Sequence, residues 1–249
     1  MDLNTVYQKA LPYMYKIETQ DGYGTGFIYY IIQRNDQQFL VYIATAAHVI
    51  AKAKEWYQPI RLRHYSSTES KLLYPNMYTI FLSPFSDSAI IQIDGNNVPF
   101  AYHEPLPDLP SLSEYNSIVP IGKNVTWMGF PNIEPECVCL FSGLVSAHKK
   151  VNNFTTYIID GVSIHGVSGG PVMYISEHNR VEIIGVVSSY SPNRAFGQTL
   201  PGLMYACDVS YFNLVNNALA SQEAAATEEP PTTEPPTTEP LYDTDGEIK

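Results

Sequence analysis

Short runs of β-branched and aromatic residues, separated by turn-forming residues, dominate the sequence from about Pro12 to Val209. Such side chains suit the pleated surface of a strand, and the Gly, Pro, Asn and Asp residues between them end one strand before the next begins. Many short strands of this kind are typical of β-barrels and β-sandwiches. The sequence therefore predicts an all-β domain, with strand candidates that include LPYMYKIET, GTGFIYYIIQ, QFLVYIATA, SAIIQI, VTWMGF, FTTYIID and VEIIGVVSS.

The sequence after Val209 changes character twice. First, Phe212, Val215 and Leu219 follow helical spacing, which predicts a short C-terminal helix over about residues 209–220. Residues 221–249 then repeat a Pro-Pro-Thr-Thr-Glu unit, which has few apolar residues and whose prolines lack a backbone donor. We expect this segment to be a disordered, semi-extended tail that acts as a solvated spacer, with a docking role as the alternative.

The formal net charge of −11 is concentrated in this tail. From Glu223 onward eight acidic residues face one basic residue, so the tail carries −7 and the rest of the chain −4. Nucleic-acid binding draws on clustered Lys and Arg, so we expect a protein or peptide partner and no nucleic acid. No segment has the apolar length of a membrane span or of a signal peptide, and the oligomeric state is left open.

The cysteines are sparse and odd in number: Cys137, Cys139 and Cys207. Three thiols cannot build the disulfide framework of a small secreted domain, so a reducing, cytoplasmic compartment is the expectation. Cys137 and Cys139 are not followed by a second Cys or His pair at zinc-site spacing. We interpret all three as structural thiols and expect no metal site.

Three local patterns occur in the order His, Asp, Ser. The run ATAAHVI predicts that His48 lies where a strand gives way to a tight turn, and FSDSAIIQID puts Asp87 directly before an apolar strand. In IHGVSGGPV, Ser168 is surrounded by glycines, which permit a sharply turned loop and a close approach of substrate backbone. Each pattern alone has a structural interpretation: a packing histidine, a turn aspartate or an ordinary glycine turn.

Together the three residue types support nucleophilic catalysis. A serine hydroxyl needs an adjacent base, and an imidazole accepts its proton near neutral pH and later donates it to the leaving amine. A carboxylate fixes the imidazole tautomer and stabilises the imidazolium. We therefore expect Ser168 as nucleophile, His48 as general base, Asp87 as its orienting group, and the N–H groups of Gly166 and Ser168 as oxyanion donors that contribute about 3–4 kcal/mol. This chemistry needs no cofactor.

Six ordered motifs resemble those of the trypsin-like serine peptidases, and in particular the HtrA/Deg branch. They are GYGTGFIY, TAAHV, DSAIIQID, VTWMGFPN, FSGLVSAHK and GVSGGPV. The resemblance implies a protease domain over residues 1–220 made of two six-stranded antiparallel β-barrels. The first barrel would span about residues 10–105 and the second about residues 118–208.

The chain departs from these relatives in two respects. No appended peptide-binding PDZ module follows the protease body, so we do not expect the oligomeric chaperone behaviour of the HtrA branch. Position 167 is Val167, where the secreted enzymes carry an Asp that pairs with a newly cleaved N-terminus. We therefore expect a protein that folds in its active form and is controlled by access or loop order.

The resemblance also implies a pocket for the side chain that precedes the scissile bond. Val162 would form its base, with Gly185, Val187 and Ser189 on the neighbouring wall. An apolar base lacks the carboxylate that selects Lys or Arg, so the sequence predicts a preference for uncharged, aliphatic side chains. His165 is interpreted as an uninvolved loop residue rather than a substrate contact.

Three functions fit these observations. The first is a serine endopeptidase that hydrolyses peptide bonds through a Ser168 acyl-enzyme. The second is a catalytically silent peptide-binding module on the same fold, since a fold does not fix a function. The third is a protease that processes its own precursor. The presence of the whole triad favours an enzyme, although Asp94 is a rival for the acid.

Overall fold

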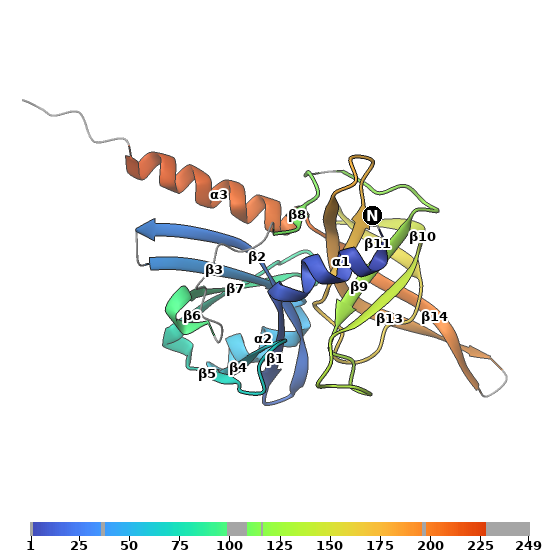
Figure 1. Ribbon diagram of the computed structural model, residues 1–249, viewed down its shortest axis with the longest axis horizontal. Helices are drawn as coiled ribbons and strands as arrows, with labels where there is room; N and C mark the ends of the chain where they lie inside the picture. The colour runs from blue at the N-terminus through green and yellow to red at the C-terminus, as the bar shows by residue number, and fades with distance from the viewer. Residues whose placement is uncertain (1, 36–37, 99–108, 116, 196–197, 228–249) are drawn as a thin grey trace, which may run out of the picture. The chain divides into compact units, whose positions relative to one another are not determined.

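The computed structural model describes residues 2–35, 38–98, 109–115, 117–195 and 198–227. Two seven-stranded sheets, one from each half of the chain, make up most of it (Figure 1). The all-β expectation is confirmed. The first sheet has the strand order β5-β4-β1-β2-β3-β7-β6. Its strands are β1 (Met14–Thr19), β2 (Gly22–Asn35), β3 (Gln38–Thr45), β4 (Ile60–His64), β5 (Lys71–Leu73), β6 (Tyr78–Leu82) and β7 (Ala89–Asp94).

The second sheet closes on itself. Strand β12 pairs with β9 on one side and with β13 on the other, so six strands form a ring in the order β12-β9-β10-β11-β14-β13. Strand β8 is added to β13 in parallel. The strands are β8 (Ser111–Leu112), β9 (Asn124–Gly129), β10 (Cys139–Val151), β11 (Phe154–Asp160), β12 (Pro171–Ile175), β13 (Val181–Ala195) and β14 (Gln198–Asp208).

The first sheet is curled because its two edge strands are neighbours in the chain. β5 and β6 are joined only by Tyr74 and the 3-10 helix η2 (Pro75–Met77), which forces the two edges of the sheet toward each other. Each sheet has one strand more than the six expected. β5 has three residues and β8 has two, which is too short for an alternating pattern to be visible in the sequence.

Helices are few. They are α1 (Leu3–Ala10), α2 (Ala47–Glu55), α3 (Ser210–Thr227) and the 3-10 helices η1 (Leu11–Tyr13), η2 and η3 (Gly95–Asn97). The expected tight turn at His48 is wrong, because His48 lies in the first turn of α2. The segment AHVIAKAKE is rich in good helix formers, and its buried residues Ile50 and Ala53 are three apart, on one helix face.

The C-terminal helix is longer than predicted. α3 begins at Ser210, next to the expected residue 209, but continues to Thr227 through the alanine-rich segment that follows Ser221. The chain divides after Leu214 into two units, and the described part of the second is the remainder of α3. Residues 228–249 of the predicted tail and residues 99–105 of the predicted first barrel lie outside the described residues.

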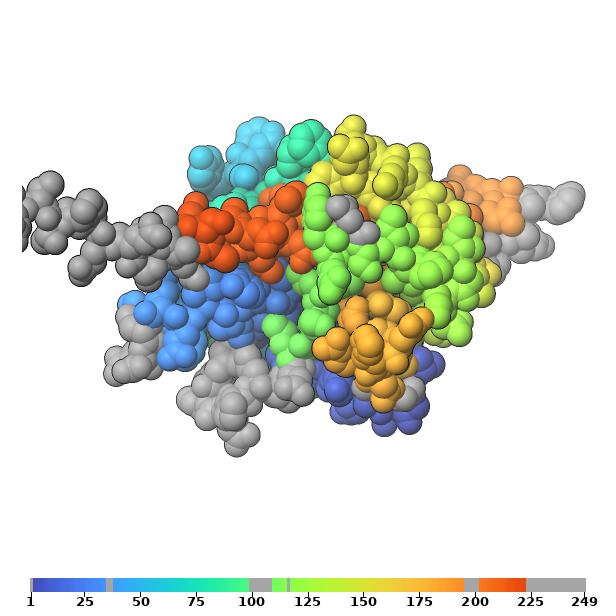
Figure 2. Space-filling model, turned by 90° about the horizontal axis from the view of Figure 1, so that it is seen from above, coloured from blue at the N-terminus to red at the C-terminus, as the bar shows by residue number. Residues whose placement is uncertain are grey.

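Each sheet encloses its own apolar core. The first core contains Ile17 of β1, Ile43 of β3 and Ile91 of β7, all fully buried. The second contains Trp127 and Tyr157, which are also fully buried. In the space-filling view the blue and cyan atoms of the first sheet lie beside the green and yellow atoms of the second (Figure 2). No helix in the described ranges is long and apolar enough to cross a bilayer.

The two tryptophans allow a test of the second core. Trp127 is fully buried and its ring stacks on Phe141, whereas Trp56 is 65% exposed. Trp127→Ala should lower the free energy of unfolding by about 3–5 kcal/mol, because it removes a large buried side chain and leaves a cavity. Trp56→Ala should change it by no more than about 0.5 kcal/mol. Urea denaturation followed by circular dichroism measures both, and equal effects would contradict the assignment of the core.

Candidate active site

A cavity of about 650 Å³ is lined by residues from strand β13 of the second sheet and from segments that connect the strands of both sheets. The helix α2 contributes His48, the β6–β7 loop (residues 83–88) contributes Asp87, and the β11–β12 loop (residues 161–170) contributes Ser168. The remaining lining residues are Ser163, Ile164, His165, Ser188, Ser189, Tyr190 and Pro192. The structure thus brings the three predicted triad residues, which are far apart in the sequence, to one cavity.

The carboxylate of Asp87 binds His48 twice. Its Oδ2 lies 2.7 Å from Nδ1 of the imidazole, and its Oδ1 accepts a hydrogen bond of 2.9 Å from the backbone N–H of His48. The first N–H groups of a helix lack acceptors within the helix, and Ala46 at the N-cap of α2 provides no side-chain acceptor. Asp87 therefore caps α2 and orients the imidazole with the same carboxylate.

Ser188 is a third partner of this carboxylate. Its hydroxyl, from strand β13 of the second sheet, donates a hydrogen bond of 2.7 Å to Oδ2 of Asp87. No pattern in the sequence predicts this contact, because nothing in VVSSY points to an aspartate 101 residues away. The hydrogen bond connects Asp87, which belongs to the first half of the chain, to the second barrel.

The electrostatics of His48 follow from this arrangement. The hydrogen bond to Asp87 is the main cause that raises the pKa of His48 above its ordinary value, and the negative charge of Asp87 acts in the same direction. Partial burial lowers the pKa of His48 and offsets some of this effect. The imidazole is thus a stronger base than a free histidine.

The loop that carries Ser168 requires its glycines. Gly166 and Gly169 have φ values of +93° and +86°, in the left-handed region that side chains disfavour. A Cβ on Gly169 would also clash with the carbonyl of Thr25 and the hydroxyl of Thr45. The carbonyl of Ser168 in turn accepts a hydrogen bond of 2.8 Å from the N–H of Thr25. The loop is therefore seated tightly on strand β2 of the first sheet.

The peptide before Gly166 has a defined orientation. The carbonyl of His165 accepts a hydrogen bond of 2.7 Å from the N–H of Asn132. Because a trans peptide directs its N–H opposite to its C=O, the N–H of Gly166 points away from Asn132. The hydroxyl of Thr25 binds the carbonyl of Gly166 at 2.7 Å. Across the described residues no acceptor binds the N–H of Gly166 or of Ser168, so both are available as donors.

The predicted substrate pocket is only partly reproduced. Ser189 lines the cavity, but Val187 is fully buried in the second core and Gly185 is packed against the carbonyl of Cys207. Val162 is 44% exposed and is not among the lining residues of the cavity. A register shift in β13 between Val187 and Ser189 changes the alternation of side chains, which a count from the sequence cannot anticipate.

The wall near Ser168 is formed instead by Ser163, Ile164, His165, Tyr190 and Pro192. His165, interpreted from the sequence as an uninvolved loop residue, thus lies at the cavity. Asp94 is not among the lining residues, and its carboxylate accepts a hydrogen bond of 2.9 Å from the N–H of Asn96 at the start of η3. Asp94 is therefore a cap residue.

The described residues contain no group of three or more His, Cys, Asp or Glu side chains that could hold a metal ion. Cys137, Cys139 and Cys207 are free thiols. Burial is the main cause that raises the pKa of Cys207 to about 11, and it also raises that of Cys139. A raised pKa keeps these two thiols protonated near neutral pH, which agrees with a structural role.

Two barrel-like sheets with a His–Asp pair and a serine in a shared cavity define the class of double-barrel serine peptidases. The family model described as "Trypsin-like peptidase domain" matches residues 24–186. The chain therefore belongs to the trypsin-like peptidase family. No curated protein matches the sequence at a significant level.

Solved structures share the fold at low sequence identity. The crystal structure of Deg5 is 19% identical with a TM-score of 0.59, over 88% of this chain and 94% of that one. An HtrA-type protease, AlgW with a tripeptide, is 16% identical with a TM-score of 0.58, over 90% of this chain and 65% of that one. Rv3671c from M. tuberculosis H37Rv, in an inactive mutant form, is 18% identical with a TM-score of 0.53, over 92% and 94%. The HtrA-type fold expected from the motifs is confirmed.

The His48–Asp87 pair predicts a measurable titration. Asp87→Asn removes the charge that stabilises the imidazolium, so the pKa of His48 should fall below its wild-type value. Histidine ring resonances followed by NMR between pH 4 and pH 9 measure this, with His48→Gln to assign the signal. Asp94→Asn, a change at the remote cap, should leave the titration of His48 unaltered. An unchanged midpoint in Asp87→Asn would exclude the pairing.

Proposed function

We propose that the protein is a serine endopeptidase that hydrolyses peptide bonds through an acyl-enzyme on Ser168. The observation that carries this proposal is the shared cavity, in which Ser168 and His48 both line the wall and His48 is held by Asp87. Membership of the trypsin-like peptidase family makes a protein or peptide the substrate class. The reaction needs no group other than these side chains and water.

In the first step Oγ of Ser168 attacks the carbonyl carbon of the scissile bond while Nε2 of His48 takes the hydroxyl proton. Asp87 holds Nδ1–H and stabilises the positive charge on the imidazole. The carbonyl oxygen becomes negative, and the N–H groups of Gly166 and Ser168 are the donors available to it. His48 then protonates the leaving amine, which breaks the peptide bond and leaves the acyl group on Ser168.

In the second step His48 takes a proton from water, and the resulting hydroxide attacks the acyl-enzyme. The tetrahedral intermediate collapses, Ser168 regains its proton from His48, and the carboxylic acid product leaves. The raised pKa of His48 means that its neutral form, which acts as the base, is lost at a higher pH than for a free histidine. The acid limb of the activity profile is therefore expected above the ordinary histidine value.

Reaction with a fluorophosphonate probe tests the nucleophile. The wild-type chain should be labelled on Ser168, and Ser168→Ala should abolish labelling because the attacking oxygen is gone. Ser191→Ala changes an exposed serine of β13 outside the cavity lining and should be labelled like the wild type. Mass spectrometry of the labelled protein locates the adduct. A folded wild-type protein that is not labelled would refute the peptidase and favour a silent peptide-binding module.

The cavity lining also supports a preference for uncharged side chains before the scissile bond. Apart from the triad residues and Ser188, its polar side chains are the hydroxyls of Ser163, Ser189 and Tyr190 and the imidazole of His165. Among the described residues that line the cavity, Asp87 is the only carboxylate, and it is already bound to His48 and Ser188. A Lys or Arg side chain would thus find no free carboxylate there.

Cleavage of a peptide library measures this preference. We expect hydrolysis after Lys or Arg to be at least roughly tenfold slower than after the best uncharged residue, because a buried cation without a partner is costly. His165→Ala should alter the ranking of the uncharged residues while leaving Lys and Arg disfavoured. A dominant preference for Lys or Arg would contradict the proposed pocket.

A further inference from the structure

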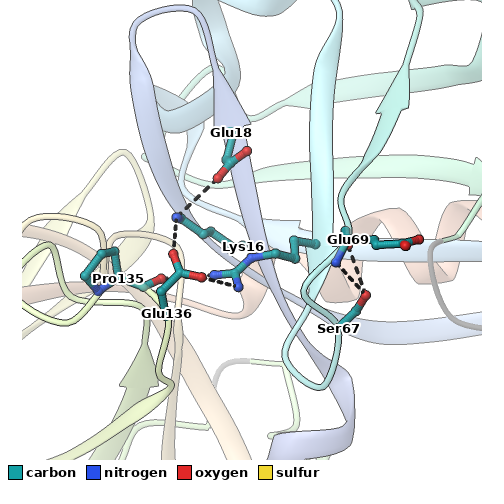
Figure 3. A network of polar contacts seen from close by, with 7 residues as sticks. Lys16, Glu18, Ser67, Glu69, Pro135 and Glu136 are labelled. Carbon is teal, nitrogen blue, oxygen red and sulfur yellow. Dashed lines mark hydrogen bonds and ion pairs between the residues drawn. The ribbon is translucent and has the colours of Figure 1, made fainter.

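A cluster of charged residues connects the first sheet to the β9–β10 loop (residues 130–138) of the second. Glu136 in this loop accepts a hydrogen bond of 2.7 Å from Nη1 of Arg63 on β4, and its other oxygen lies 3.7 Å from Nζ of Lys16 on β1. Nη2 of Arg63 donates to the carbonyl of Pro135 at 3.1 Å. Lys16 also pairs with Glu18 at 3.2 Å (Figure 3). Arg63 thus holds both a side chain and the backbone of the loop.

The burial of these groups is unequal. The side chains of Lys16 and Arg63 are each 8% exposed, whereas that of Glu136 is 70% exposed. An exposed ion pair adds little to the free energy of unfolding, because water and salt screen it. Two nearly buried cations nevertheless require counter-charge, and Arg63 forms its ion pair with Glu136. Glu136 therefore balances the charge of Arg63 and, in the same contact, fixes the position of the loop.

Both cations lie near aromatic residues, Tyr23 and Phe130, that also approach Gly166. Nζ of Lys16 is 4.3 Å from the ring centre of Tyr23, and a Cβ on Gly166 would lie only 2.6 Å from the edge of that ring. The guanidinium of Arg63 is 5.8 Å from the ring centre of Phe130, whose backbone carbonyl oxygen would clash with the same Cβ. Gly166 is thus enclosed by two residues that the charged cluster supports.

The same loop fixes the orientation of the His165–Gly166 peptide, since Asn132 donates to the carbonyl of His165. The next residue of the nucleophile loop, Val167, is fully buried in the apolar core and has no charge with which to hold that peptide. The contacts that orient the N–H of Gly166 therefore come largely from the β9–β10 loop. That loop is tied to the first sheet through Glu136.

We propose that Glu136 is a positioning residue: by pairing with Lys16 and Arg63 it holds the β9–β10 loop, and through Asn132 it keeps the N–H of Gly166 directed toward the reacting carbonyl. The inference rests on the proposed function, because the donor matters only when an oxyanion forms. Loss of the ion pair lets the loop move away from His165, and the His165–Gly166 peptide is then free to rotate. Most of the cavity wall, formed by Ser163, Ile164, Ser189, Tyr190 and Pro192, lies outside this peptide.

The test compares Glu136→Gln with Glu134→Gln in the full chain. Glu134 is an exposed residue of the same loop that pairs with neither Lys16 nor Arg63, so its change controls for charge and loop composition. Glu136→Gln should lower kcat about tenfold or more with KM changed less than about threefold, since a donor to the transition state is misplaced. Glu136→Gln should also weaken inhibition by a peptide aldehyde, by about the same factor as it lowers kcat. Thermal midpoints within a few degrees of the wild type would exclude unfolding as the cause.

Amide hydrogen exchange followed by NMR gives a readout that does not require catalysis. The N–H of Asn132 is hydrogen-bonded to His165, so its exchange should be about tenfold faster in Glu136→Gln and unchanged in Glu134→Gln. Equal exchange and equal kcat in the two variants would overturn the inference, as would a rise in KM alone. The two proposals can fail separately. If fluorophosphonate does not label the wild-type chain, the peptidase is refuted. If Glu136→Gln nevertheless accelerates exchange at the N–H of Asn132, the control of the loop by Glu136 is still supported.

Discussion

The site depends on the hydrogen bonds that the carboxylate of Asp87 accepts. This carboxylate accepts hydrogen bonds from the backbone and the ring of His48 and from the hydroxyl of Ser188. These partners belong to a helix between β3 and β4 of the first sheet and to a strand of the second, so one side chain joins three segments that are remote in sequence. The same carboxylate accepts a hydrogen bond from the N-terminus of α2 and raises the pKa of the His48 imidazole. The formation of the helix and the basicity of His48 therefore depend on one side chain.

Thr25, which is fully buried, performs the corresponding task for the loop that carries Ser168. Its N–H and hydroxyl bind the carbonyls of Ser168 and Gly166, and its hydroxyl accepts from the N–H of Phe130 at 3.0 Å. Buried polar groups must be paired, so these contacts leave the loop little freedom. The catalytic geometry is consequently set by hydrogen bonds between the two barrels rather than by either barrel alone.

Much of this arrangement could be predicted from the sequence, because each triad residue lies within a local pattern. Strand alternation, the glycines around Ser168 and the acid before an apolar strand are all short-range signals. Ser188 and Asn132 carry no such signal, since their partners are set by tertiary packing. The pocket prediction failed at Val187 for a related reason: a register shift in β13 reverses which side chains face the core, and no local pattern reports it. A turn was expected at His48 in place of a helix, because the small residues of ATAAHVI can end a strand and can equally begin a helix.

The charged cluster at Glu136 is another contact that is set by tertiary packing and has no local sequence pattern. Lys16 and Arg63 alternate with apolar residues on their strands, and their sequence context suggests ordinary solvent-facing positions. In the fold the β9–β10 loop covers them, so they are buried by a segment more than 60 residues away. The positive charges of Lys16 and Arg63 need a negative partner on the loop that covers them. Glu136 provides it although most of its side chain is exposed, because only the carboxylate has to contact the two cations. Electrostatic balance therefore acts on the position of that loop, and with it on the orientation of the peptide before Gly166, in addition to the burial of Phe130 and its hydrogen bond to Thr25.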